Sequence, residues 1–222
     1  MRIDWRLELP QWLLIGGMFA LAAINWQTAP DRIPVHWDLA GEVDRYGGKF
    51  EGLLLLPLMA LGLYLLLLFL PLVDPLRANY ARFRGTYAVL RLGVMVVIGA
   101  IYAVTILWIG GRQVDVGLAV TLVVGGLMLL LGILLPRVQP TWFVGIRTPW
   151  TLSSRESWEK THRVGSYYFI ALGIAIIIVG VSRAGWALWL AVALMLGGLV
   201  GLIVYSYLVW RADPNKSSPL GR

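Results

Sequence analysis

Six long stretches of the chain contain no Asp, Glu, Lys or Arg, and this feature limits the fold more than any other. They cover residues 9–30, 52–73, 92–111, 116–136, 164–182 and 184–210. A helix needs about 20 predominantly apolar residues to cross the hydrocarbon core of a bilayer. In lipid a segment must satisfy its own backbone hydrogen bonds, which only a helix or a closed barrel achieves. Because the stretches show no alternation of polar and apolar residues, they predict an all-α polytopic membrane protein, a bundle of six transmembrane helices.

The composition favours lipid over water as the surrounding solvent. Hydrophobic residues make up 59% of the 222 residues and charged residues only 14%, whereas an average soluble domain has roughly a quarter charged residues. A net charge of +7 would suggest nucleic acid as the partner of a soluble protein. In a membrane protein Lys and Arg gather in cytoplasmic loops, so no direct nucleic-acid partner is expected. The absence of Cys excludes disulfides, thiolate metal sites and Cys nucleophiles.

The distribution of Lys and Arg predicts the orientation. One set of connections and both termini contain 14 of these residues, and the opposite connections contain five. The positive-inside rule places the richer side, and therefore both termini, in the cytoplasm. The first stretch is interpreted as a retained span, because its exit at residues 26–31 lacks a small-x-small cleavage site. The polar residues then gather in an outer loop, residues 30–51, and an inner loop, residues 136–163.

The outer loop is acidic, with five carboxylates against three Lys or Arg. Its glycines predict a folded loop with defined turns. His36 and Asp38 offer a nitrogen and an oxygen to a divalent cation, but the spacing matches no compact metal motif, so a self-satisfied hydrogen-bonded loop is the favoured interpretation. Alternatively, the acidic residues attract a cationic ligand from outside, with Trp37 and Tyr46 adding aromatic contact.

The inner loop predicts a short interfacial helix that leads into the fifth span. Ser153 followed by Glu156 fits a capping box at its start, and Pro149 fixes the chain upstream. One helical face is then shared by Trp158, Thr161, His162 and Gly165. This helix is interpreted either as an anchor on lipid head groups or as a recognition surface.

Catalysis and ion-coupled transport are both disfavoured. The topology places His36 outside and His162 inside, separated by a hydrocarbon core of about 30 Å, so they form no dyad and no common metal site. No GxSxG, HExxH or Walker sequence is present. The polar residues within the stretches include Asn25, Thr105, Thr121, Ser166 and Ser206. None is ionisable, which argues against a proton- or ion-coupled transporter.

Proline and glycine predict local features of the spans. Pro57 is expected to kink the second helix. Gly197 and Gly201 form a small-xxx-small pair in the sixth span, interpreted as ordinary helix packing within one monomer rather than a dimer face. The glycines expected to allow close approach of the fourth span are Gly125, Gly126 and Gly132.

Both loops resemble known sequence patterns. The outer segment of residues 33–38, with Gly41, Asp44 and Lys49, is similar to a small membrane domain of unknown function. The inner segment of residues 145–153, followed by Trp158, Thr161 and His162, resembles the signature of the SdpI family, whose members carry both domains in tandem over six spans. The resemblance implies a two-helix domain with an extracytoplasmic acidic loop at residues 1–85. It also implies a four-helix domain with a cytoplasmic loop at residues 86–222.

The family is named for a bacterial immunity protein that protects the cell from a secreted toxic peptide and holds a transcriptional repressor at the membrane. The resemblance therefore implies immunity to, or sensing of, an antimicrobial peptide in the bacterial inner membrane, without enzyme activity or a cofactor. The expected contacts with a peptide toxin are His36, Trp37, Asp38, Asp44 and Lys49. The expected contacts with a cytoplasmic regulator are Arg147, Thr148, Trp150, Trp158 and His162. The alternatives are a transporter of a small or lipidic molecule and a membrane enzyme that uses His162.

Overall fold

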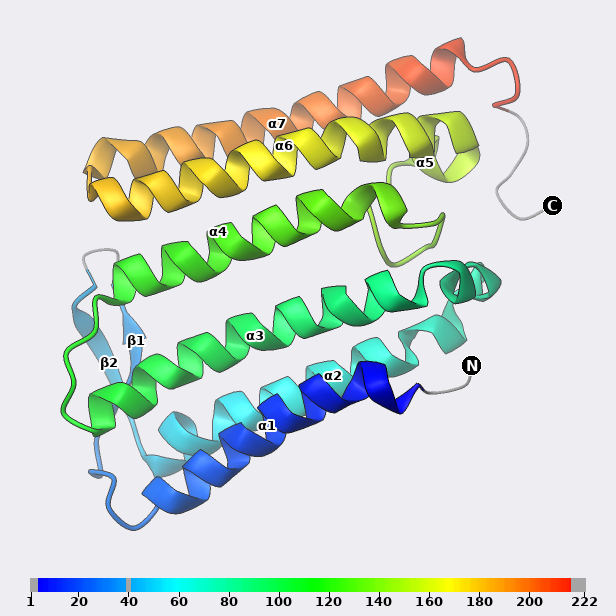
Figure 1. The fold of residues 1–222 in the computed structure, drawn as a ribbon. Coiled ribbons are helices and arrows are strands. Elements are labelled where there is room, and N and C mark those ends of the chain that lie inside the picture. Colours follow the sequence, from blue (N-terminus) through cyan, green and yellow to red (C-terminus); the bar gives the residue numbers. More distant parts are fainter. Residues whose placement is uncertain (1–3, 39–40, 217–222) are drawn as a thin grey trace. The chain divides into compact units, whose positions relative to one another are not determined.

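The structure is a computed structural model that describes residues 4–38 and 41–216 (Figure 1). Helices form almost all of its regular structure. In chain order the elements are α1 (Trp5–Asn25), β1 (Ile33–Trp37), β2 (Val43–Gly47), the π-helix η1 (Phe50–Leu55), α2 (Leu56–Val73), the 3₁₀-helix η2 (Arg77–Arg82), α3 (Arg84–Ile109), α4 (Val116–Leu134), the 3₁₀-helix η3 (Leu135–Arg137), α5 (Pro149–Ser153), α6 (Arg155–Ser182) and α7 (Gly185–Ala212).

Six helical segments of the described chain are long and apolar enough to cross a membrane. They are Trp5–Asn25, Phe50–Val73, Arg84–Ile109, Val116–Arg137, Arg155–Ser182 and Leu188–Ala212. The prediction of an all-α polytopic protein with six spanning helices is thus confirmed. The orientation stays a prediction, and two of the residues counted for it, Arg2 and Arg222, lie outside the described residues.

Several helices begin earlier than the charge-free stretches suggested. The first starts at Trp5, where the Asp4 carboxylate accepts a hydrogen bond from the backbone N–H of Arg6 as an N-cap. The third starts at Arg84, inside the connection proposed from the sequence. A charged side chain does not end a helix, because the backbone hydrogen bonds continue past it. Charge-free stretches therefore mark the middle of each span and not its ends.

The chain divides into two compact units, and each is described by itself. The N-terminal unit consists of the described residues up to Leu68 and of Arg91–Val124. The C-terminal unit consists of Phe69–Leu90 and the described residues from Gly125 onward. The boundary between residues 85 and 86 implied by the resemblance stays a prediction.

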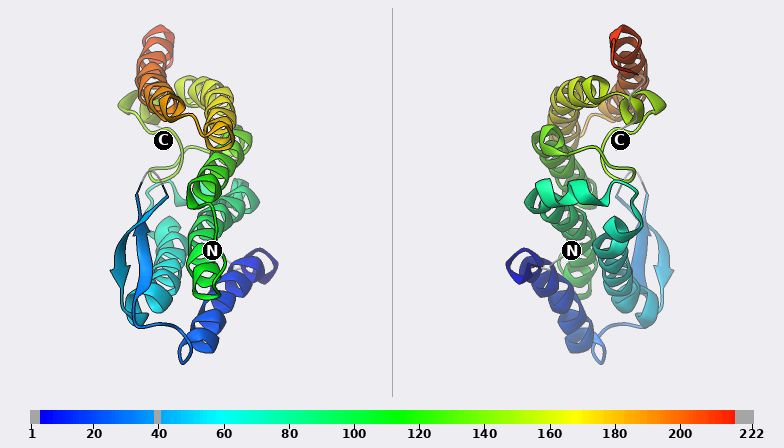
Figure 2. Two further views of the ribbon diagram at one scale, coloured as in Figure 1. Left: turned by 90° about the vertical axis from the view of Figure 1, so that its left-hand side faces the viewer. Right: turned by 90° about the vertical axis from the view of Figure 1, so that its right-hand side faces the viewer.

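The core of the N-terminal unit lies where α1, α2 and α3 pack together. Its buried residues are Ile15, Met18, Ala60, Tyr64, Met95 and Tyr102. A second cluster attaches the β1–β2 hairpin to α1 and η1, and consists of Ala22, Ala29, Ile33 and Leu53. The side chain of Ile33 is fully buried there. Figure 2 shows the hairpin beside the start of the α2 segment, which agrees with its packing on η1.

The second span carries its irregularity before Pro57. Residues Phe50–Leu55 form a π-helical segment that changes to α-helix at Leu56. Proline has no N–H to donate to the carbonyl four residues earlier, which loosens the turn N-terminal to it. The predicted kink is therefore expressed as a wider helical turn upstream of Pro57.

In the C-terminal unit α6 and α7 lie side by side along their length (Figures 1 and 2). Two glycines of α4 allow the close approach of α6 predicted for them. A Cβ built at Gly125 lies 2.9 Å from the carbonyl oxygen of Gly173, and one at Gly132 lies 2.8 Å from that of Ser166. The Ser166 hydroxyl also donates a 2.6 Å hydrogen bond to the Gly132 carbonyl oxygen. Gly126 has no such neighbour within 4 Å.

The interpretation of Gly197 and Gly201 as packing residues within the monomer is wrong. Both glycines are exposed on α7, and no atom lies within 4 Å of a Cβ built at either position. The close contact of α7 with α6 is instead made at Gly198, where a Cβ would collide with the Tyr168 ring. The residue that permits close packing is therefore adjacent in sequence to the predicted pair and lies on another face of the helix.

Candidate functional sites

The acidic loop predicted on the outside folds into an antiparallel β-hairpin. Ile33 pairs with Gly47 and Trp37 with Val43, and the register shifts between these pairs. The connection uses Gly41 at a φ of +84°, a backbone conformation that favours glycine. The Asp38 carboxylate accepts a 2.9 Å hydrogen bond from the backbone N–H of Glu42. The predicted folded loop is thus a hairpin whose turn is closed by one of its own carboxylates.

Polar side chains of the outer loop bond to one another or to the chain at the end of α1. His36 Nδ1 lies 2.6 Å from Asp44 Oδ1 on the facing strand, and both side chains are exposed. Arg45 pairs with Glu51, and Lys49 Nζ donates a 3.1 Å hydrogen bond to the Trp26 carbonyl oxygen. The histidine therefore contacts Asp44 and not Asp38, the residue considered with it from the sequence. Among the described residues no group of three or more His, Cys, Asp or Glu side chains is arranged to hold a metal ion.

The exposed side of the hairpin combines carboxylates with an aromatic ring. Asp38, Glu42 and Asp44 are exposed, and Tyr46 is 43% exposed. The guanidinium of Arg32 lies 5.1 Å from the centre of the Tyr46 ring, a cation–π arrangement. This surface can attract a positively charged ligand and offer it an aromatic contact.

The connection between α4 and α6 contains the second candidate site. Gly145 adopts a φ of +109°, and its neighbour Ile146 donates a 3.0 Å hydrogen bond from its backbone N–H to His162 Nε2. Because Nε2 accepts, the ring carries its proton on Nδ1 and donates it to the Trp158 carbonyl oxygen at 2.8 Å. The His162 and Trp158 rings stack with centroids 4.0 Å apart. Both rings thus support the turn at Gly145.

Trp158 and His162 are only 1% exposed, so the structure does not support their predicted direct contact with a partner. The Trp158 indole N–H donates to the Val138 carbonyl oxygen at 3.0 Å, and the ring packs with Tyr80, Phe83 and Tyr87. The predicted shared face of this helix is confirmed, because its four residues are all buried. Their role is to hold the connection in shape.

The predicted start of this helix is wrong in detail. Thr148 and Thr151, and not Ser153 and Glu156, form the capping box, and they begin the short helix α5. Helix α6 then starts with Ser154 as its N-cap and continues without interruption to Ser182. Ser153 donates its hydroxyl to the Pro149 carbonyl oxygen. Glu156 pairs with Lys160 at 2.6 Å, so neither predicted partner is available for a capping box.

The starts of α5 and α6 are bonded to the end of α7 through buried hydroxyl groups. Thr148 Oγ1 lies 3.0 Å from Ser206 Oγ, and Ser157 donates to the Ser206 carbonyl oxygen at 2.8 Å. Ser154 donates to the buried carboxylate of Asp213. That bond, with the backbone N–H of Asn215, holds the pKa of Asp213 below its usual value.

Of the five residues predicted to meet a cytoplasmic partner, Arg147 is exposed, Trp150 is half-buried and the other three are buried. The Arg147 guanidinium donates to the Trp142 carbonyl oxygen at 2.8 Å. Trp142 and Phe143 are 51% and 40% exposed, and sequence reasoning did not select them as contacts. The accessible surface of this connection is therefore formed by Trp142, Phe143 and Arg147.

Asp74 is a further residue that sequence reasoning missed. It is 2% exposed, and its carboxylate accepts hydrogen bonds from the backbone N–H of Leu76 and Trp142 and from the Tyr80 hydroxyl. Burial and this hydrogen bond raise the pKa of Tyr80, so its hydroxyl stays a donor at physiological pH. Asp74 thereby ties the α2–α3 connection to the α4–α6 connection.

We expect Asp74→Asn to lower the free energy of unfolding by about 1–2 kcal/mol, because the amide places an NH₂ group against N–H or O–H donors. Thermal unfolding in detergent measures the effect. Asp31→Asn makes the same change at an exposed carboxylate and serves as control. Equal unfolding midpoints for the two variants would show that Asp74 does not hold these connections together.

A buried ion pair joins three helices of the N-terminal unit. Arg91 on α3 makes two hydrogen bonds to Glu8 on α1, at 2.6 and 3.0 Å. The Tyr64 hydroxyl on α2 donates to the same carboxylate at 2.9 Å, and Gln11 Nε2 lies 3.4 Å from it. Glu8 is 4% exposed and Arg91 2%.

This pair corrects the expectation that no ionisable residue lies within a span. Glu8 and Arg91 belong to helical segments long and apolar enough to cross a membrane. Ionisable residues in such segments face the protein interior and pair with one another, as these do. Each lies directly before a charge-free stretch. Because the stretches were defined by the absence of charged residues, both residues were assigned to the segments outside the spans. The argument against ion-coupled transport from an absence of such residues therefore no longer holds.

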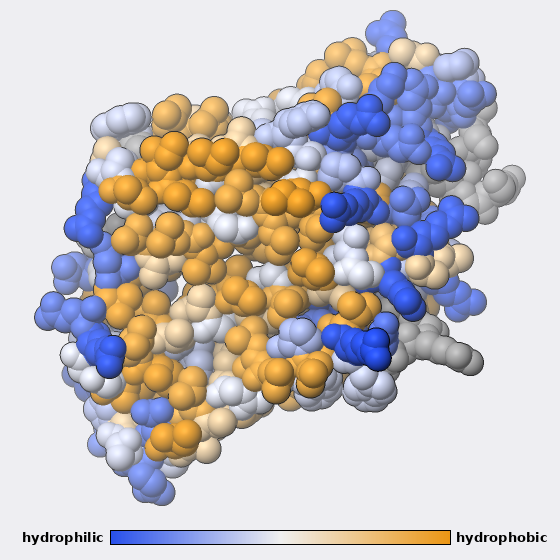
Figure 3. Space-filling model, in the orientation of Figure 1, coloured by the Kyte–Doolittle hydropathy of each residue, from blue (hydrophilic) through white to orange (hydrophobic). Residues whose placement is uncertain are grey.

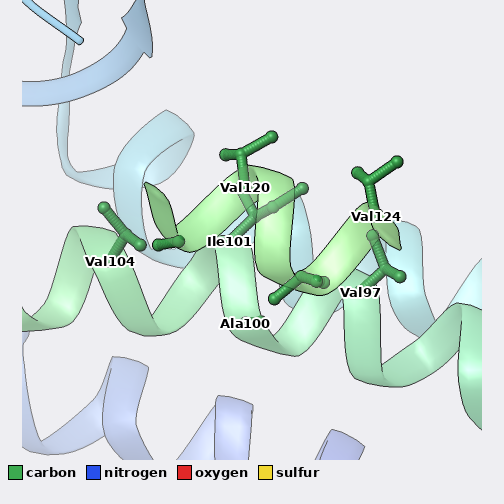
Figure 4. Close-up of a pocket in the computed structure, with 8 residues that line it drawn as sticks. Val97, Ala100, Ile101, Val104, Val120 and Val124 are labelled. Carbon is green, nitrogen blue, oxygen red and sulfur yellow. The ribbon is translucent and has the colours of Figure 1, made fainter. Parts of the chain in front are cut away.

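A small apolar cavity lies between α3 and α4 within the N-terminal unit (Figure 4). It has a volume of about 20 Å³ and is lined by Val97, Ala100, Ile101, Val104, Ala119, Val120, Val123 and Val124. A space of this size holds about one water molecule, and its walls offer that water no polar partner. The cavity therefore gives no support to a transport path.

Comparisons with known proteins agree with the patterns in the two loops. Residues 137–206 match the SdpI/YfhL protein family, and residues 13–61 match a domain of unknown function (DUF1648). The chain is 22% identical over 195 residues to the immunity protein SdpI of Bacillus subtilis (strain 168), an alignment that covers 88% of this chain and 91% of that protein. No solved structure matches significantly. The match at residues 13–61 contains the β-hairpin, and the match at residues 137–206 contains α6 and most of α7.

Proposed function

We propose, because this chain belongs to the SdpI family, that it confers immunity to an antimicrobial peptide at a bacterial cell membrane. The observation that supports this proposal is the similarity, over nearly the whole chain, to a relative named as an immunity protein. Both termini lie in the cytoplasm in this proposal, as the positive-inside rule predicts. The β-hairpin then faces the side from which a secreted peptide arrives, and the α4–α6 connection faces the cytoplasm.

In this proposal the hairpin is the surface that meets the peptide. Its carboxylates suit a cationic peptide, and charge complementarity raises the rate of encounter. Trp37 is half-buried and Tyr46 exposed, so an aromatic surface is available beside the charges. His36, Asp44 and Lys49 act mainly by shaping the hairpin, since each bonds to a group within the same loop or at the end of α1.

The cytoplasmic side of the proposal is the surface of Trp142, Phe143 and Arg147, with Trp150 beside it. Two exposed aromatic rings next to an arginine are a composition typical of protein interfaces. A regulator bound here connects the membrane protein to gene expression. Thr148, Trp158 and His162 support this surface from within. That the protein acts without enzyme activity and without a cofactor is still an expectation from the family resemblance.

We predict that Asp38→Asn combined with Glu42→Gln lowers the tolerated concentration of a cationic antimicrobial peptide about tenfold. Each substitution removes a charge and keeps the size of the side chain. The loss of about 0.7 kcal/mol of attraction at each position together corresponds to a tenfold change in affinity. Survival is measured in a strain that lacks its own copy and expresses either protein. Binding of the labelled peptide to protein in nanodiscs gives a second measurement.

Arg45 keeps its pairing in the double variant, so the hairpin is expected to remain folded. Glu159→Gln combined with Glu156→Gln removes two charges from α6 and serves as the control. Unchanged survival of the hairpin variant at equal protein levels, or replacement of the whole hairpin without loss of protection, would contradict the proposal.

A further inference from the structure

The faces that α6 and α7 turn toward each other differ in chemistry near the start of α6. An open groove of about 460 Å³ lies between them, within the C-terminal unit. Its α6 wall carries Glu156, Lys160, Arg163 and Val164, and its α7 wall carries Tyr205, Leu208, Val209 and Ala212. Both sets follow helical spacing, so each forms one continuous face. One wall is therefore charged and the other almost entirely apolar.

The charged wall has a net positive charge. Lys160 Nζ lies 2.6 Å from Glu156 Oε1, so these two charges largely cancel. No ion pair is formed by Arg163 within the part of the chain that the structure describes, and its side chain is exposed. A guanidinium left without an anion beside an aliphatic wall suits a ligand with an anionic group and an apolar part. Phosphate is a preferred partner of Arg.

The position of the groove selects the class of ligand. Arg155–Ser182 and Leu188–Ala212 are long and apolar enough to span a membrane, and the groove lies at their adjacent ends. Figure 3 shows hydrophilic residues gathered at the end of the C-terminal unit where α6 begins, beside an apolar surface along the helices. A groove at this level meets lipid head groups on one side and acyl chains on the other.

We propose that this groove is a binding site for one anionic phospholipid of the surrounding leaflet. Arg163 and Lys160 contact the phosphate, and the Tyr205 hydroxyl is placed to donate to the head group. An acyl chain lies against Val164, Leu208 and Val209. The bound lipid fills the groove and joins the ends of α6 and α7. This site is independent of the peptide and regulator surfaces proposed above.

Native mass spectrometry of the purified protein, titrated with phosphatidylglycerol or phosphatidylcholine, tests the site. We expect tighter binding of the first phosphatidylglycerol than of the first phosphatidylcholine. Arg163→Gln should weaken phosphatidylglycerol binding about fivefold, the factor for one basic residue at a membrane surface. Arg155→Gln removes the same charge from α6 outside the groove, where Arg155 pairs with Glu159, and should leave the affinity unchanged.

A second variant tests the apolar wall without any change of charge. Leu208→Trp fills the groove from an exposed position on α7, so it should remove the preference for phosphatidylglycerol while the protein remains folded. Equal binding of the two lipids by the wild-type protein would overturn the proposal. Equal losses for Arg163→Gln and Arg155→Gln would also overturn it, since they would indicate attraction by overall charge. Binding of an added cytoplasmic peptide in place of lipid would assign the groove to a protein partner.

Discussion

Arg91→Met is expected to lower the free energy of unfolding by about 3–5 kcal/mol, the usual cost of removing one member of a buried ion pair. Methionine has a similar length but leaves the Glu8 carboxylate buried without its cation. Water cannot reach this carboxylate, because Glu8 is only 4% exposed. Tyr64 and Gln11 remain as partners but carry no charge. Denaturant unfolding of the protein in detergent micelles measures the loss.

The double variant Glu8→Gln with Arg91→Met separates the lost pair from the uncompensated charge. The glutamine oxygen can still accept from the Tyr64 hydroxyl, and no buried charge remains, so the double variant should be more stable than Arg91→Met alone. Arg112→Met removes an exposed arginine just beyond α3 and should change little. If Arg91→Met is as stable as this control, or if the second substitution restores nothing, the ion pair does not hold α1, α2 and α3 together.

The spans could be predicted from the sequence because lipid imposes the same requirement on every residue of a span. A charge-free stretch such as 116–136 almost coincides with its helical segment, Val116–Arg137. The folded outer loop was predictable from its glycines, one of which, Gly41, has the positive φ that glycine permits. These features depend on residues close together in the sequence, so they can be predicted from one sequence alone.

The long-range pairs could not be predicted in this way. Glu8 and Arg91 are separated by 83 residues, and Asp74 and Trp142 by 68. A carboxylate at the end of an apolar stretch has the same sequence signature whether it faces water or a buried arginine. Arg91 was therefore included in the count of loop Lys and Arg residues to which the positive-inside rule was applied. Burial of such groups depends on how helices pack, which the order of residues along one helix does not specify.

The shape of the α4–α6 connection leads to a second large effect, at Gly145. Its φ of +109° is rarely adopted by residues with a side chain, and a Cβ built there collides with His162 Nε2 and lies 3.1 Å from the Trp158 ring. Gly145→Ala therefore strains the backbone and displaces the ring that accepts the Ile146 N–H. We expect a loss of about 2–4 kcal/mol, from the strain and the broken hydrogen bond together. Thermal unfolding in detergent, together with the amount of protein in membranes, measures it.

Two other glycines separate the backbone strain from the collision with His162. Gly111 has a φ of +73°, and no atom lies within 4 Å of a Cβ built there. Gly111→Ala therefore introduces backbone strain without a collision, and should lower the free energy of unfolding by about 1–2 kcal/mol. Gly126 is exposed on α4 and has neither restriction, so Gly126→Ala should be neutral or stabilising, because alanine favours a helix. The stabilities should therefore fall in the order Gly126→Ala, Gly111→Ala, Gly145→Ala. If the last two are equal, the close fit against His162 contributes nothing, and the buried histidine does not support the connection that carries the proposed cytoplasmic surface.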